Sequence, residues 1–207
     1  MDGPPEIAVD AMGGDDAPDA IVRGASEASR TTGAIIELVG EPRTIQRILD
    51  RVPHVPERVR VVPAEGAIPM DAKPEPALAA MPNASLPVAV ARVGRAGGPR
   101  ALVTAGNTSA VVLACARGFG RLPGVRRTAL AAVIPTEKRR GARQDPFSLL
   151  LDAGATLRVT ARDLAVFAIM GAAYSAIVSR HPRPRVALLS NGTEPTKGPP
   201  EVVGAHP

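Results

Sequence analysis

Four short segments combine glycine with small polar or acidic side chains, and each follows a run of apolar residues. They are residues 10–15, 104–109, 151–155 and 190–194. Glycine lets the backbone approach a ligand closely, and the start of a helix after such a loop offers unpaired N–H groups to an anion. The pattern therefore predicts an anion-binding site. The alternative interpretation is that each segment is an ordinary tight turn.

The apolar runs before these segments predict the strands that must position them. Unbroken runs, rather than alternating ones, are typical of a parallel sheet that is covered on both faces. Stretches with helical periodicity lie between the runs, so we expect an α/β fold with an open, mostly parallel, doubly wound sheet. Ligands bind beyond the carboxyl ends of such strands, so the four segments should meet at one edge of the sheet. The predicted strands are residues 7–9, 35–39, 59–62, 101–105, 129–134, 149–151 and 186–189.

Several helix boundaries can also be predicted. Five prolines in residues 69–87 limit any helix there to a short one. Ser85 is a candidate cap for a helix that runs to about Arg95. Residues 108–117 are apolar nearly all round, so their helix should be buried or lie at an interface. Thr160 and Asp163 form a capping-box pattern before a long apolar helix that extends to about residue 179.

Composition excludes several classes of protein. The 207 residues carry a net charge of +5, but only 2% are aromatic, so there is little on which to stack nucleic-acid bases. A single cysteine excludes an internal disulfide, and three histidines leave little for a Cys/His metal site. No apolar run approaches the roughly 18 residues of a membrane span and no secretory leader opens the chain, so we expect a cytoplasmic protein. Nucleotide-binding and serine-hydrolase glycine motifs are missing.

Five blocks of the sequence, in order, resemble the phosphate acyltransferase (PlsX) family. They are IAVDAMGGD from Ile7, AGNT from Ala105, LDAGA from Leu151, FAIMG from Phe167, and LSNGTE from Leu189 with Lys197-Gly198 after it. The resemblance runs from residue 7 to residue 198. It implies a fold similar to those of isocitrate dehydrogenase and phosphotransacetylase.

The resemblance also implies an activity and partners. Members of the family form acyl phosphate from acyl-acyl carrier protein and inorganic phosphate, in phospholipid synthesis. They are homodimers that associate peripherally with the membrane, and no cofactor or metal is implied. Phosphate is itself the nucleophile, which agrees with the lack of an activated serine or cysteine; Cys115 is expected to be a core residue.

The resemblance assigns roles to particular residues. Asn107, Asp152 and Asn191 are the candidate catalytic residues, as oxyanion donors or as carboxylates that manage protons. Backbone N–H groups near Gly106 and the Lys197 ammonium could hold phosphate. The full set expected to bind phosphate or substrate is Asp10, Gly13, Gly14, Asp15, Gly106, Thr108, Ser109, Thr193, Glu194 and Lys197.

The family usually continues well past this point, with a further glycine-rich loop and helices. We therefore expect residues 1–198 to form an incomplete phosphate acyltransferase-like domain and residues 199–207 a divergent or truncated tail. An alternative function remains open, namely a truncated, non-catalytic homologue that binds acyl carrier protein, phosphate or a family partner without turnover. A nucleotide-binding, dehydrogenase-like domain is disfavoured because its glycine fingerprint is missing.

Overall fold

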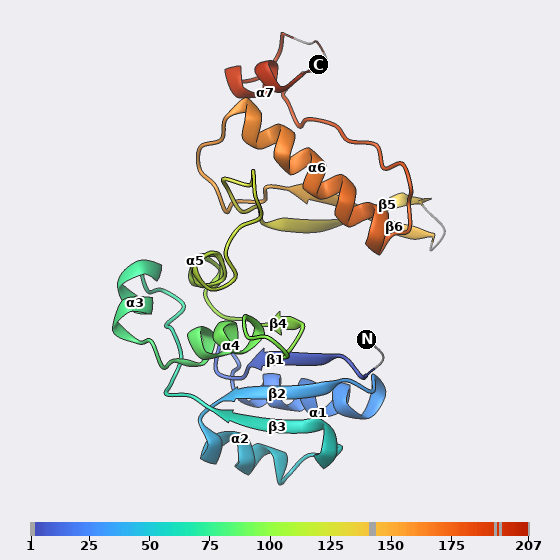
Figure 1. Cartoon of the computed structure of the whole chain (residues 1–207). Helices are drawn as coiled ribbons and strands as arrows, with labels where there is room; N and C mark the ends of the chain where they lie inside the picture. The colour runs from blue at the N-terminus through green and yellow to red at the C-terminus, as the bar shows by residue number, and fades with distance from the viewer. Residues whose placement is uncertain (1–2, 141–143, 193, 195, 207) are drawn as a thin grey trace. The chain divides into compact units, whose positions relative to one another are not determined.

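The computed structural model describes residues 3–140, 144–192, 194 and 196–206; for residues 138–140 it describes only the backbone. The chain forms two compact units, Met1–Gly120 and Arg121–Pro207 (Figure 1). The first unit holds the loops at residues 10–15 and 104–109, and the second holds those at 151–155 and 190–194.

A four-stranded parallel sheet organises the first unit. Its strands are β1 (Glu6–Asp10), β2 (Ile35–Gly40), β3 (Val59–Pro63) and β4 (Ala101–Val103), arranged in the order β3-β2-β1-β4. All three pairings are parallel. The doubly wound α/β class predicted from the sequence is confirmed, because helices cover both faces of this sheet.

The two faces have separate hydrophobic cores. On one face α1 (Asp19–Thr31) and α2 (Pro42–Leu49) bury Val22 and Ile45 against Ile36 and Leu38 of β2. On the other face α4 (Ser85–Val93) buries Ala89 against Ala8, Val39 and Ala64. Neighbouring residues of β2 thus enter different cores, as expected when side chains alternate across a covered sheet.

Two further helices pack around α4. Helix α3 (Pro74–Ala80) is short, as the prolines predicted, and α5 (Thr108–Gly118) packs against both α3 and α4. Only Ala110 and Ala114 of α5 are buried, so this apolar helix is less enclosed than expected. Cys115 of α5 packs at the margin of the hydrophobic cluster that contains Ala110 and Ala114, and burial raises the pKa of its thiol.

The second unit departs from the predicted parallel sheet. Strands β5 (Ala131–Arg140) and β6 (Asp145–Leu151) form a separate antiparallel pair, and the predicted strand at residues 186–189 is irregular backbone. An apolar run does not specify strand direction, and the short polar connection between β5 and β6 allows an antiparallel hairpin. Helix α6 (Ala161–Val178) packs on β6, and α7 (Pro200–Ala205), within the expected tail, packs on α6.

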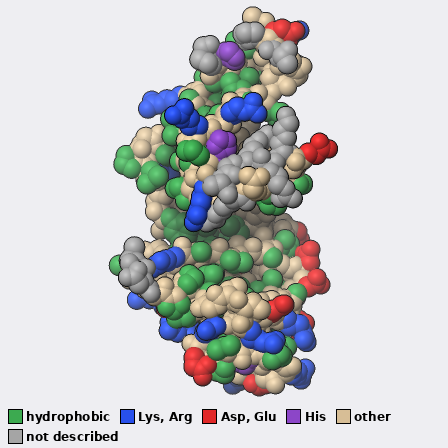
Figure 2. Space-filling model, turned by 90° about the vertical axis from the view of Figure 1, so that its right-hand side faces the viewer, with side chains coloured by type: hydrophobic (Ala, Val, Ile, Leu, Met, Phe, Trp, Pro, Cys, Tyr) green, Lys and Arg blue, Asp and Glu red, His purple; other side chains and the backbone are tan. Residues whose placement is uncertain are grey.

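Helix α6 begins as the sequence predicted but lies largely uncovered. Thr160 and Asp163 form the capping box. By length and composition alone α6 could cross a membrane, with 11% of its residues buried, which corrects the view that no segment approaches a span. Among its side chains Ile169 is 70% and Ile177 76% exposed. Figure 2 shows hydrophobic side chains at the surface of the second unit, beside Lys and Arg side chains.

Candidate phosphate site

Loops after β1 and β4 lie side by side at the carboxyl edge of the parallel sheet. The chain runs from β1 outward to β2 and β3, and then returns to place β4 on the other side of β1. This reversal is a topological switch point, where two neighbouring loops diverge and leave room for a ligand. The register pairs Val9 with Val103, so the next residue of β1, Asp10, lies beside Thr104.

Asp10 holds the first loop and joins it to the second. The residue is 1% exposed. Oδ1 accepts hydrogen bonds from the backbone N–H groups of Met12 (3.3 Å) and Gly13 (3.1 Å), and Oδ2 accepts one from Thr104 Oγ1 (2.8 Å). Thr104 Oγ1 accepts in turn from Gly106 N at 3.0 Å. The buried carboxylate is thus satisfied by groups from both loops.

Gly13 and Gly106 let the two loops approach each other. A Cβ atom on Gly13 would lie 2.5 Å from Asp10 Oδ2 and 3.0 Å from the Cα of Gly106. A Cβ on the next residue, Gly14, would lie 3.0 Å from that of Ala105, and its φ of 121° already disfavours any other residue. The sequence prediction that these glycines allow a close backbone approach is confirmed for this pair of loops.

Asn107 holds a third loop, residues 69–72, beside the N-terminus of α5. Its Oδ1 caps α5 by accepting from Ala110 N at 3.1 Å. Its Nδ2 lies within 3.0 to 3.2 Å of the carbonyl oxygens of Pro69, Met70 and Ala72. Asn107 is 8% exposed, and its amide donors are occupied by the 69–72 backbone.

The N-terminus of α5 faces this cluster with exposed residues. Thr108 and Ser109 are the first two residues of the helix and both are exposed. Their N–H groups have no partner within an α-helix, and the helix dipole places partial positive charge at the same end. Asp15, which follows Gly14, is also exposed. An anion at the end of α5 would therefore meet backbone donors beside the two glycine loops.

Asp152, in the second unit, repeats the arrangement of Asp10. Its Oδ1 accepts from the N–H groups of Leu130 (2.8 Å), Gly154 (3.2 Å) and Ala155 (2.9 Å), and Oδ2 accepts from Thr156 N (2.8 Å). Burial of the carboxylate works to raise its pKa, but these four backbone hydrogen bonds outweigh it, and the pKa lies below its ordinary value. A carboxylate held in this way is a weak base.

Ser190, Glu194 and Lys197 are joined by hydrogen bonds in the second unit. Ser190 Oγ donates to the carbonyl oxygen of Lys197 at 3.1 Å, and Lys197 N donates to that of Glu194 at 2.9 Å. A Cβ on Gly192 would lie 2.8 Å from Glu194 Oε2 and 2.9 Å from Lys197 Cγ, so the side chains of both flank this glycine. Asn191 is exposed, and Thr193 lies outside the described residues.

The candidate residues therefore form two groups. Loops 10–15 and 104–109 come together as predicted, whereas Asp152, Asn191, Glu194 and Lys197 belong to the other compact unit. That all four loops share one site stays a prediction. No group of three or more metal-ligating side chains occurs within the part of the chain that the structure describes.

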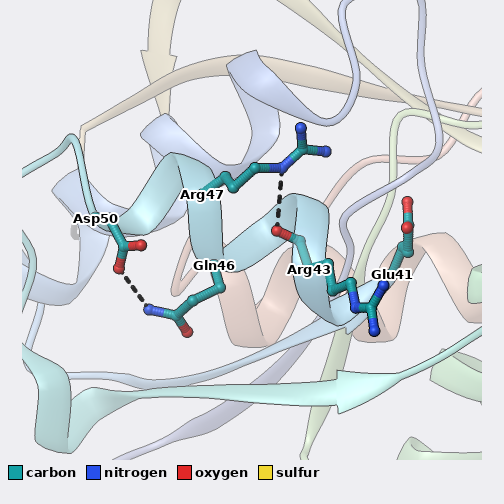
Figure 3. Close-up of a pocket in the computed structure, with 5 residues that line it drawn as sticks. All are labelled: Glu41, Arg43, Gln46, Arg47 and Asp50. Atoms are coloured by element: carbon teal, nitrogen blue, oxygen red, sulfur yellow. Dashed lines mark hydrogen bonds between the residues drawn. The ribbon is translucent and has the colours of Figure 1, made fainter.

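A surface depression elsewhere offers no comparable chemistry. Its lining comes entirely from the exposed side of α2 and its ends, as Figure 3 shows. Gln46 Nε2 donates to Asp50 Oδ1 at 2.8 Å, and Arg47 Nε donates to the Arg43 carbonyl oxygen at 3.3 Å. Two arginines of the helix lie between Glu41 and Asp50 at its ends, and such a mixture of exposed charges is typical of a solvated surface.

Sequence reasoning missed two contributors to the cluster. The sequence marks Thr104 only as part of a motif, but Thr104 follows β4 just as Asp10 ends β1, and this equivalence of strand ends is a signal that identifies it. The sequence marks the 69–72 segment only as part of a proline-rich stretch, and its contact with Asn107 spans at least 35 residues of sequence. No local pattern predicts a contact of that range.

Comparisons with known proteins agree on one family. Residues 6–207 match the family described as "Fatty acid synthesis protein". A protein of Thermosynechococcus vestitus named "Phosphate acyltransferase" is 42% identical over 201 residues, which cover 97% of this chain and 56% of the relative. Proteins of the same name from Heliobacterium modesticaldum (42% identical, 97% and 58% covered) and Nitratidesulfovibrio vulgaris (40%, 93% and 53%) are also similar. The chain thus spans little more than half the length of these relatives.

Proposed function

Because this chain belongs to the fatty acid synthesis protein family, whose curated members here are named phosphate acyltransferase, we propose that it takes part in acyl transfer to inorganic phosphate. The acyl donor is acyl-acyl carrier protein and the product is acyl phosphate, for phospholipid synthesis. The observation that carries this proposal is the close approach of the Gly13 and Gly106 loops beside the N-terminus of α5.

The reaction needs an anion to be held and aimed at a thioester. A phosphate oxygen attacks the carbonyl carbon, a C–O bond forms, and the C–S bond breaks. The proton of hydrogen phosphate passes to the departing thiolate, so acyl phosphate and the free carrier-protein thiol result. The N–H groups of Thr108 and Ser109 would bind phosphate oxygens, and the orientation of the nucleophile supplies much of the rate acceleration.

Three polar side chains that are already hydrogen-bonded to backbone groups position the loops around the candidate residues. Asp10 sets the distance between the two glycine loops, and Asn107 fixes the 69–72 segment beside α5. Asp152 does the same for its own loop in the second unit, where its lowered pKa disfavours a role as general base. We assign these three residues to positioning rather than to direct proton transfer.

The second unit supplies the remaining candidates. Lys197 is exposed, and its ammonium suits neutralisation of phosphate or of the developing oxyanion. Asn191, exposed beside it, offers an amide donor, and Glu194 flanks the same glycine as Lys197. We propose that these residues bind phosphate or substrate, as the family resemblance implies. On the family resemblance we also propose a cytoplasmic homodimer that associates peripherally with the membrane.

A substitution that removes one backbone N–H group tests whether the N-terminus of α5 binds phosphate. Thr108→Pro removes one N–H donor at the first helical position, where proline is tolerated. The preceding Asn107 already has the extended ψ of 111° that proline requires. Phosphate-dependent release of carrier-protein thiol should fall roughly 100-fold or more, as for loss of one oxyanion donor. Thr108→Ala, which keeps the N–H group, should retain most of the rate.

The same assay separates catalysis from binding. If Thr108→Pro and Thr108→Ala release thiol equally fast, the α5 N-terminus does not hold the nucleophile. If the wild-type chain binds phosphate and carrier protein yet releases no thiol, the non-catalytic alternative is correct.

A further inference from the structure

Ser85 carries a buried hydroxyl without a hydrogen-bond partner. The residue is 0% exposed, and its Oγ bonds to no atom of the described residues. Two other serines are equally buried, but Ser26 Oγ donates to the Val22 carbonyl and Ser29 Oγ to that of Ser26, each at 2.7 Å. A buried polar group that lacks a partner lowers stability, so it calls for an explanation.

The hydroxyl lies at the N-terminal end of a second helix that begins at the candidate site. Ser85 is the first residue of α4, and helical Cα–Cβ bonds tilt toward the N-terminus. Backbone bonds connect this end to the loops after the strands: Ser85 N donates to Gly66 O at 3.0 Å, and Ala64 N donates to Gly40 O at 2.9 Å. Ser85 thus lies at the carboxyl edge of the sheet.

The same end of α4 adjoins α5 and the segment that Asn107 holds. Ala84 and Leu86, on either side of Ser85, pack with Ala110 in the first turn of α5. Ile68 packs in the same cluster, and it lies between Gly66 and the 69–72 carbonyl groups bound by Asn107. Residues 66–72 therefore pack against the Ser85 end of α4, and both apolar contacts and the Asn107 amide connect them to α5.

We propose that the Ser85 hydroxyl is a ligand of the phosphate substrate, so that α4 and α5 hold the anion together. The inference rests on the function proposed above. Because Ser85 is fully buried, the anion reaches it only when residues 66–72 move away from α4. That movement breaks the contacts of Asn107 with Pro69, Met70 and Ala72, so Asn107 positions this segment before the anion binds and its amide is free near the anion afterwards.

Phosphate titration of the complete 207-residue chain tests the proposal without an activity assay. Thermal unfolding is followed against inorganic phosphate at constant ionic strength, since a ligand of the folded state raises the midpoint in proportion to its affinity. Ser85→Ala should unfold at the wild-type temperature or above it without phosphate, because it removes an unpaired hydroxyl. Its phosphate affinity should be about 10- to 100-fold weaker, the effect of losing one hydrogen bond to a charged group.

Ser26→Ala is the matched control, since it removes a buried serine hydroxyl that is already bonded. It should unfold at a lower temperature and bind phosphate as the wild type does. Ser85→Cys, which nearly keeps the side-chain volume but donates weakly, should also bind phosphate less tightly, and it carries the test if Ser85→Ala does not fold. Amide hydrogen exchange of residues 66–72 should accelerate with phosphate in the wild type.

Equal phosphate affinity of wild type and Ser85→Ala would overturn the proposal, as would a wild type that binds no phosphate. A parallel titration with dimethyl phosphate distinguishes inorganic phosphate from the phosphodiester of a carrier-protein arm. If Ser85→Ala weakens binding of the diester but not of inorganic phosphate, the proposal is also contradicted. A chain that binds phosphate through Ser85 but releases no thiol contradicts only the proposed acyl transfer.

Discussion

Polar residues at strand ends act here on the backbone that follows them. Asp10 and Asp152 each accept hydrogen bonds from N–H groups two to four residues ahead, and Asn107 caps the helix that it precedes. These side chains occupy the positions expected of catalytic groups, yet their oxygen atoms are largely engaged. Their contribution to function is the shape of the loops, which brings backbone donors together.

Gly13 gives the sharpest test of that shape. Gly13→Ala places a methyl group 2.5 Å from Asp10 Oδ2 and 3.0 Å from backbone, so the free energy of unfolding should fall by about 2 kcal/mol. Gly24→Ala is the control, because Gly24 is exposed in α1 and a Cβ there would meet nothing outside its own helix within 4 Å; it should raise stability by about 1 kcal/mol. Urea unfolding measures both; equal effects would contradict the close packing of the loops.

Asp163 should make the stability of the second unit depend on acidity. Hydrogen bonds from the backbone and side chain of Thr160, and the pairing with Arg126, lower its pKa to about 2, against the opposing effect of burial. A carboxyl whose pKa is lower in the folded state stabilises the fold at pH values above its unfolded pKa of about 3.9. This contribution disappears as the pH falls toward 2.

The variant Asp163→Asn isolates this effect. At about pH 6 it should unfold at lower urea concentration than the wild type, and the difference should shrink as the pH approaches 2. Far-ultraviolet circular dichroism follows the loss of α6, which Asp163 caps. A difference that stays constant over this range would show that the carboxyl does not titrate with the shifted pKa.

At the scale of elements, α6 combines a well-formed start with a largely uncovered surface. Phe167 is 3% exposed, whereas Ile169 and Ile177 are mostly exposed. Contiguous apolar surface of this kind marks an interaction site or promotes aggregation. The helix is therefore stabilised by its cap and by one buried side, while its other sides contribute little to the fold of the second unit.

Substitutions on the two sides of α6 should act differently. Ile169→Glu with Ile177→Glu should change the free energy of unfolding by no more than about 0.5 kcal/mol per site and should reduce light scattering on heating. Phe167→Ala should lower stability by about 3 kcal/mol, because it leaves a cavity in the buried side. Strong destabilisation by the double glutamate variant would show that the exposed side is packed in solution.

At the scale of the whole molecule, the chain consists of two units with different sheets. The first has the parallel sheet and the switch point, and the second has the antiparallel pair and α6. Residues 118–124 are all exposed where one unit gives way to the next, and Gly120 and Gly124 both have positive φ. Exposed backbone with few contacts is the usual site of proteolytic cleavage.

Brief digestion with trypsin should therefore cut first after Arg121 or Arg127, which are both exposed. Two fragments that correspond to the units should accumulate before either is degraded. Arg23 and Arg47, exposed within helices of the first unit, are the internal control, because helical backbone resists the protease. First cuts after those residues would contradict the division into two units.

The sequence determined what depends on neighbours along the chain. Unbroken apolar runs indicated the strands of the covered parallel sheet, the Thr160–Asp163 spacing predicted the capping box, and glycine beside Asp10 and Asn107 indicated the loops. The tertiary structure alone decided which groups meet. The pairing of β1 with β4 brings Asp10 to Thr104, and residues 69–72 engage the amide of Asn107. The free hydroxyl of Ser85 and the antiparallel β5–β6 pair were equally unpredictable, because hydrogen bonding and strand direction depend on partners distant in sequence.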